Sequence, residues 1–245
     1  MEISLWLLPL LALVAFLYAS VGHAGASGYI AVLALAGLPA AQIKPLALVL
    51  NLAVAAQGSW QFWRAGHLRW PLLWPVLLTG LPAAFAGGWL DLPTQWFQRL
   101  VAVVLLASAW RFLQHPRDPD RLCAPSLVGL LLSGAGLGLL AGLTGTGGGV
   151  FLTPLLLLSG WASTRQAAAV SILFIFGNSL TGLAGLLLAR QGDLPILPPQ
   201  LGWMLLTVAL AGAVGARLGS RHWPVAWIRR CLALVLVLAA LKLAL

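Results

Sequence analysis

Charged side chains are scarce in this chain, and carboxylates are the scarcest of them. Only 8% of the 245 residues are charged, whereas a soluble domain typically carries about 25%. All the acids lie near the termini or in connections between apolar runs: Glu2, Asp91, Asp118, Asp120 and Asp193. Because no acid lies within an apolar run, the sequence argues against a cation pump or metal transporter that works through buried carboxylates.

Cysteine and histidine are also few, with 2 and 4 residues. Cys123 and Cys231 have no CxxC or Cys/His spacing, so they indicate neither a metal site nor a disulfide framework. No GxSxG, HExxH or P-loop sequence occurs, and the glycines have no soluble strand–helix–strand context for a dinucleotide site. We therefore expect no enzyme activity, no metal and no cofactor.

Apolar residues dominate instead, at 61% of the chain with a mean hydropathy of +0.97. This composition predicts several membrane spans. Residues 3–17 resemble the core of a signal peptide, but no Lys or Arg precedes them, so we expect a retained first helix. The net charge of +9 comes mostly from Lys and Arg at the ends of apolar runs, which is typical of charges that orient spans and not of nucleic-acid binding.

Two of the apolar runs, 26–38 and 148–160, are short, and each directly follows a glycine-rich stretch. Eight others are long enough to cross a bilayer: 3–21, 43–63, 71–89, 97–113, 126–143, 166–189, 200–219 and 225–244.

The two halves of the chain resemble each other. Gly25 corresponds to Gly147, and RAGHL at 64–68 corresponds to RQGDL at 190–194. Duplicated units of this kind are common in secondary transporters. We therefore expect a single transporter domain that consists of repeat one at 1–113, a polar connection at 114–125 and repeat two at 126–245.

The charges favour inverted repeats. If the short segments do not cross, the 14 basic residues divide seven against seven between the two sides. If both cross, there are ten passes, and only Lys44, Arg99, Arg190 and Lys242 lie on the less basic side. The expected fold is an all-α polytopic membrane protein with two inverted repeats, eight long transmembrane helices and two short discontinuous helices after the glycine-rich breaks.

The tryptophans and two of the basic residues are best explained by positions at the membrane interface. The 12 tryptophans lie mostly near the ends of apolar runs, as in an interfacial belt. Lys44 and Arg165, where two long helices begin, could attract anions into a vestibule or extend to the interface, and we favour the second interpretation.

The glycine-rich breaks, GHAGASG at 22–28 and GLTGTGGG at 142–149, are the strongest candidates for a ligand site. Irregular backbone at membrane depth is tolerated only within protein or beside a wet cavity. Glycine lets successive amides point at one spot, and a helix N-terminus adds about half a positive charge. We expect two anion-binding cups near the midplane. Close helix packing better explains the other glycines, namely Gly129, Gly134, Gly136, Gly138, Gly212, Gly215 and Gly219.

Polar side chains accompany these breaks. Asn51 and Asn178 occupy nearly equivalent places in the two repeats, as interhelical contacts or as substrate ligands. His23 could donate to an anion, carry a proton, or be a neutral side chain bonded to a carbonyl. The candidate substrate-binding residues are Gly22, His23, Gly25, Ser27, Asn51, Thr144, Gly145, Thr146, Gly147, Gly148, Gly149 and Asn178.

Three stretches, GLTGTGGGVFLTPLL at 142–156, SVGHAGASGYIAVLALAGLP at 20–39 and AGAVGARLGS at 211–220, resemble the TauE/SafE sulfite exporter family, also called the toluene sulfonate uptake permease family. The resemblance covers essentially the whole chain. It implies a multi-pass secondary carrier in the inner membrane for small sulfur-containing anions such as sulfite, sulfoacetate or another organosulfonate.

The sequence and the resemblance together predict an anion transporter that works by alternating access. Its partners would be the small anion and the lipid bilayer, with a homodimer left open and no nucleic acid. Two other classes remain as alternatives, namely a passive channel for anions or weak acids, and a membrane scaffold or enzyme subunit without transport.

Overall fold

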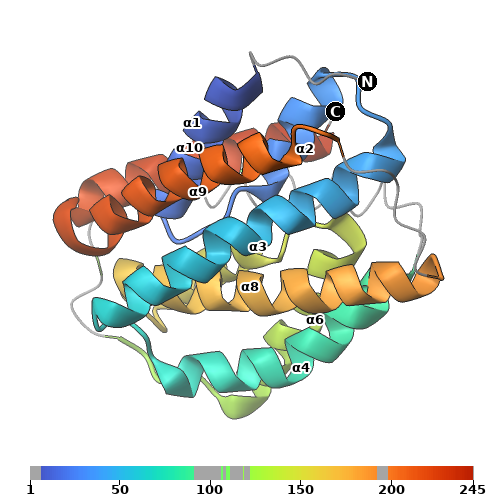
Figure 1. The fold of residues 1–245 in the computed structure, drawn as a ribbon. Coiled ribbons are helices and arrows are strands. Elements are labelled where there is room, and N and C mark those ends of the chain that lie inside the picture. The colour runs from blue at the N-terminus through green and yellow to red at the C-terminus, as the bar shows by residue number, and fades with distance from the viewer. Residues whose placement is uncertain are drawn as a thin grey trace.

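The computed structural model describes residues 7–90, 106, 109–110, 118, 122–191 and 198–244. Within these residues every regular element is a helix (Figure 1). The elements are α1 (Leu7–Ser20), α2 (Ala26–Leu35), α3 (Ala40–Arg64), α4 (Trp70–Trp89), α6 (Leu127–Thr144), α7 (Gly149–Leu158), α8 (Thr164–Ala189), α9 (Leu201–Arg217), the π-helix η1 (Leu218–His222) and α10 (Val225–Ala244). Most of the predicted span 97–113 and most of the connection 114–125 fall outside the described residues.

The helix ends follow local chemistry. Gly37, Gly66 and Gly160 adopt left-handed backbone conformations just beyond the ends of α2, α3 and α7, where glycine avoids the strain of a Cβ. The capping box of Ser163 and Gln166 begins α8. As predicted, α2 and α7 are short and follow the glycine-rich breaks, beginning at Ala26 and Gly149 within the last residues of those stretches. Each has 10 residues and is about 15 Å long, half the thickness of the hydrocarbon core.

The long helices form three layers (Figure 1). The central layer consists of α3 and α8, with α1 and α9 packed together on one side and α4 and α6 on the other. The two central helices run in opposite directions, because Asn51 of α3 lies beside Ser179 of α8, while Gly58, later in α3, lies beside Ile172, earlier in α8. Each outer pair thus joins a helix from the first half of the chain to one from the second.

Glycine permits backbone contact within the α4–α6 pair. Cβ atoms at Gly134 and Gly138 would collide with the backbone of Val76 and Gly80. Gly136, on another face of α6, has no atom within 4 Å of the same position. The packing interpretation is therefore correct for Gly134 and Gly138, and it does not apply to Gly136.

Glycine also permits backbone contact between α1 and the segment formed by α9 and η1. Cβ atoms at Gly215 and Gly219 would collide with the backbone of Phe16 and Ser20, and one at Gly212 would crowd Val54 of α3. The packing interpretation is correct for these three glycines as well.

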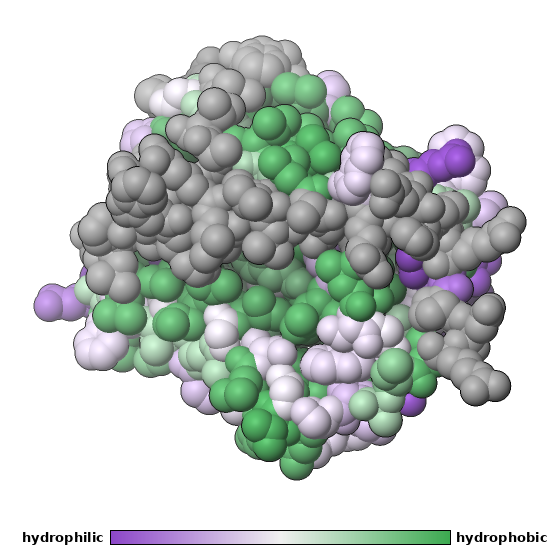
Figure 2. Space-filling view, turned by 180° about the vertical axis from the view of Figure 1, so that it is seen from behind, coloured by the Kyte–Doolittle hydropathy of each residue, from purple (hydrophilic) through white to green (hydrophobic). Residues whose placement is uncertain are grey.

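The outer surface is apolar. Leucines such as Leu132 and Leu188 are about 70% exposed, and Figure 2 shows apolar residues over much of one face. Among the described residues, four helices are long and apolar enough to span a membrane: α4, α6, α8 and α9 with η1. Eight tryptophans are between 40% and 66% exposed, as expected for side chains at the lipid interface.

A buried ion pair ties Asp118, in the connection between the two halves of the chain, to α10 in the second half. Arg229 of α10 is 4% exposed and donates to the Asp118 carboxylate at 3.0 Å and to the Thr164 hydroxyl at 2.9 Å. The same carboxylate accepts hydrogen bonds from the amide and hydroxyl of Thr164 at the start of α8. A carboxylate at a helix N-terminus is also favoured by the helix dipole.

Replacing Arg229 with glutamine is expected to destabilise the protein by about 2–3 kcal/mol, because the variant leaves the Asp118 carboxylate without its buried partner. The melting temperature in detergent should fall by roughly 5–10 °C. Arg230→Gln is the matched control, since the neighbouring Arg230 is exposed and stacks on Trp227 at 5.5 Å. Equal melting temperatures for the two variants would contradict the assigned role of the ion pair.

Candidate functional site

The two glycine-rich breaks are turns that require glycine. Gly22 and Gly25 in the first break have φ angles of 79° and 104°, and Gly145, Gly147 and Gly148 in the second have φ angles of 70°, 74° and 77°. Side chains other than glycine rarely adopt such angles. The glycines therefore end one helix and start the next within a few residues, so that the amides at the start of α2 and α7 lie inside the protein.

The breaks meet through His23. Its Nε2 atom donates a hydrogen bond to the carbonyl oxygen of Gly149, the first residue of α7, at 2.9 Å. This bond requires the proton on Nε2, so Nδ1 carries a lone pair, and Nδ1 has no hydrogen-bond partner among the described residues. His23 is 1% exposed. The carbonyl bond considered from the sequence is present, and one ring nitrogen remains available to a proton or a ligand.

Asn51 connects three helices at the first break. Its Oδ1 atom accepts a hydrogen bond from the amide of Ala26, the first residue of α2, at 2.9 Å. Its Nδ2 atom donates to the Ser179 hydroxyl of α8 at 3.2 Å. Both atoms of this fully buried amide have partners, which favours the interhelical interpretation for Asn51.

Asn178 differs from its counterpart in the first half. It is 1% exposed, yet neither Oδ1 nor Nδ2 has a hydrogen-bond partner among the described residues. Its counterpart Asn51, by contrast, accepts a hydrogen bond from the first amide of α2. A buried polar group without a partner costs about 1–3 kcal/mol, so this amide has the most to gain from a ligand.

Three other candidates, Ser27, Thr144 and Thr146, have partners of their own, and Gly147 contacts Asn51. The Ser27 hydroxyl bonds to the Tyr18 hydroxyl at 2.8 Å. The Thr144 hydroxyl lies 2.8 Å from that of Thr146 and donates to the Leu140 carbonyl. The buried Gly147 lies against Asn51, because a Cβ atom there would be 2.9 Å from its Nδ2. The second break therefore contacts the side chain that caps the first short helix.

Sequence reasoning missed Tyr29. Its ring is fully buried against Gly25, and its hydroxyl has no hydrogen-bond partner among the described residues. A single tyrosine directly after the first break, four residues from Gly25, was the available signal. Lys44, for which the sequence favoured an interfacial position, also contacts the second break, because its aliphatic stem lies against Gly145.

Comparison with known proteins agrees with this architecture. Residues 7–243 match the family model described as "Sulfite exporter TauE/SafE". A protein of Sinorhizobium fredii (strain NBRC 101917 / NGR234) described as "Probable membrane transporter protein y4hK" is 38% identical over 238 residues, which cover 94% of each chain. No solved structure matches the chain. The resemblance inferred from the sequence is thus confirmed, and the chain belongs to the sulfite exporter TauE/SafE family of membrane transporters.

Proposed function

We propose that this protein is a secondary transporter that moves small sulfur-containing anions, such as sulfite, sulfoacetate or a related organosulfonate, across the cytoplasmic membrane by alternating access. The observation that carries the proposal is the unpartnered amide of Asn178, buried in the central helix that follows the second break. Anions are the ligands that a primary amide and the N-terminus of a helix favour together.

A ten-pass topology with inverted repeats is part of the proposal. Eight passes would place Arg64 on the opposite side of the membrane from Arg217 and Arg221, whereas ten passes place all three on one side. These three arginines line one cavity. The opposite directions of α3 and α8, the third helices of their repeats, also support ten passes. The positive-inside rule then makes this basic side cytoplasmic.

The anion would bind where α7 begins. The Asn178 amide and the α7 amides would donate to its oxygens, and the Thr146 hydroxyl would become a further donor on releasing its bond to Thr144. His23 offers an acceptor at Nδ1, which suits either a protonated anion such as bisulfite or a proton taken up with the anion. Binding would thus couple to protonation without a buried carboxylate.

The three layers suggest which parts move. Hydrogen bonds and glycine contacts hold α3 and α1 to α9, while backbone contact at glycines holds α4 to α6 and, at Gly88 and Gly185, to α8. The first group, α1, α3 and α9, carries Asn51, and the second group, α4, α6 and α8, carries Asn178, so each group would move as a rigid body. Tilting the two groups against each other would open the site between Asn51 and Asn178 alternately to the two sides of the membrane.

Transport by purified protein in proteoliposomes tests this function. Vesicles preloaded with unlabelled sulfite are expected to take up radiolabelled sulfite several times faster than empty vesicles, because exchange through an alternating-access carrier avoids the return of the empty site. Liposomes without protein are the control. Flux that neither saturates nor accelerates would instead indicate a channel, and no flux of sulfite, sulfoacetate or other sulfonates would contradict the proposal.

A further inference from the structure

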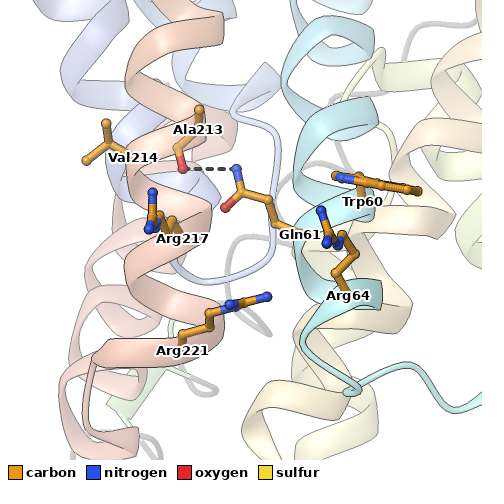
Figure 3. Close-up of a pocket in the computed structure, with 7 residues that line it drawn as sticks. All are labelled: Trp60, Gln61, Arg64, Ala213, Val214, Arg217 and Arg221. Carbon is orange, nitrogen blue, oxygen red and sulfur yellow. Dashed lines mark hydrogen bonds between the residues drawn. The ribbon is translucent and has the colours of Figure 1, made fainter.

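The cavity lined by Arg64, Arg217 and Arg221 lies outside the proposed anion site, between the ends of α3 and α9 (Figure 3). Its volume is about 340 Å³. Arg64 reaches it from α3, and Arg217 and Arg221 reach it from α9 and η1, so three guanidinium groups surround the space. None of the seven residues that line it is acidic. Such a site attracts anions, and guanidinium groups bind phosphate in a bidentate manner.

The cavity is held in shape by bonds between α3 and its neighbours. Gln57 and Gln61 donate to the carbonyl oxygens of Ala209 and Ala213 at 2.6 Å and 3.1 Å. Beyond the end of α3, His67 donates to the Ser220 carbonyl of η1 at 2.8 Å. These three bonds fix the register of α3 against α9 and η1, and with it the spacing of the arginines.

This cavity is separate from the glycine-rich breaks. Arg64 lies 13 residues after Asn51, which corresponds to about 20 Å along α3. Asn51 also faces α2 and α8, whereas the two glutamines face α9. The arginines therefore belong to a different face and a different depth of the protein.

An apolar cavity of about 500 Å³ adjoins the basic one, and the two share Trp60. Its walls include Trp63 and Trp70 as well as Leu173 and Phe176 of α8. Arg64 lies 5.4 Å above the Trp60 ring, and the Trp63 ring packs edge-on against Trp60 with ring centroids 5.2 Å apart. Trp60 and Trp63 are more than half exposed, so both cavities open at the level of the interfacial tryptophans.

We propose that the two cavities together bind an anionic phospholipid, with its phosphodiester between Arg64, Arg217 and Arg221 and an acyl chain along the apolar cavity beside Trp60. A soluble anion would use only the basic half of this surface, whereas a phospholipid uses both. Anionic lipids meet basic pockets between helices on the cytoplasmic side, which is the side assigned to these arginines under the ten-pass topology.

Thermal stability of the purified protein in a neutral detergent tests this site. Phosphatidylglycerol near a hundred times its dissociation constant is expected to raise the melting temperature by about 5 °C or more, and phosphatidylcholine by much less. The chain-free headgroup glycerophosphoglycerol and sodium phosphate are expected to cause no shift. A full shift with either soluble compound would overturn the lipid assignment and indicate a soluble-anion site.

The variant that tests the arginines is Arg217→Gln with Arg221→Gln, which is expected to lose the shift with phosphatidylglycerol. Arg230→Gln, which removes an exposed arginine from α10, is expected to keep the shift. A double variant that still responds to phosphatidylglycerol would overturn the proposal.

A second measurement needs no variant. In native mass spectrometry of the wild-type protein from equimolar lipid mixtures, bound phosphatidylglycerol should exceed phosphatidylcholine at least about fivefold, the factor expected for one basic residue near an anionic lipid surface. Equal occupancy by the two lipids would contradict the proposal.

Discussion

Replacing Asn178 with leucine is expected to reduce sulfite flux at least about tenfold while leaving the folded protein as stable as the wild type or more so. The amide has no partner to lose in the described structure, and removing a buried polar group that lacks a partner is neutral or favourable for folding. A tenfold loss corresponds to about 1.4 kcal/mol, the size of one hydrogen bond to a charged group. Flux in proteoliposomes and melting temperature in detergent are measured on the same preparation.

Asn51→Leu is the matched variant, since it makes the same chemical change at the equivalent position of the first repeat. It removes the bonds to the Ala26 amide and to Ser179, so its melting temperature should fall, by an amount equivalent to about 1–3 kcal/mol. Full flux in Asn178→Leu would remove this residue from the substrate site. A fall in stability as large as that of Asn51→Leu would give it a structural role instead.

Gly138→Leu is expected to abolish folded protein. A Cβ atom there would overlap the Gly80 carbonyl oxygen, and relief requires α4 and α6 to separate along their contact. Overpacking in a well-packed core already costs about 1–3 kcal/mol, and contact with backbone leaves no side chain that could move aside. We expect loss of the monodisperse peak in size-exclusion chromatography of the detergent extract.

Gly136→Leu provides the control, because it lies on the same helix, is exposed, and has no atom within 4 Å of the Cβ position. Both changes replace a helical glycine with a residue of higher helix propensity, so any difference between them reports packing. Normal yield and elution of Gly138→Leu would show that the α4–α6 contact is not required for folding.

The breaks and short helices could be predicted because their cause is local. Left-handed backbone at positions such as Gly147 and Gly148 requires glycine, and a cluster of glycines in an apolar run is visible in the sequence. Gly134 and Gly138 were predictable from a different signal, because small residues four apart mark a helix face that packs closely against another helix. Gly136 shares their neighbourhood in the sequence but not their face.

The partners of Asn51 and Asn178 could not be predicted. The two residues look equivalent in the sequence, and their difference depends on whether a short helix presents its first amide to them.

Arg229 and Arg230 pose a similar problem. They are adjacent in the chain and were both counted on the more basic side of the ten-pass topology, but Arg229 is buried because Asp118, 111 residues earlier, reaches it. Contacts of such long sequence separation leave no periodic signal.

The unequal use of the two asparagines has a kinetic consequence. In the proposed site, an anion meets an Asn51 amide already committed to α2 and Ser179, and an Asn178 amide that is free to bind it. An anion that arrives from the cytoplasm and one that arrives from the opposite side would therefore meet different groups first, and half-saturating concentrations would differ between the two directions. This difference between the two directions drives no net flux when the anion concentrations on the two sides of the membrane are equal. A ligand shifts an equilibrium only by its differential affinity for the two states. Direction would be set by the gradients of the anion and of the proton.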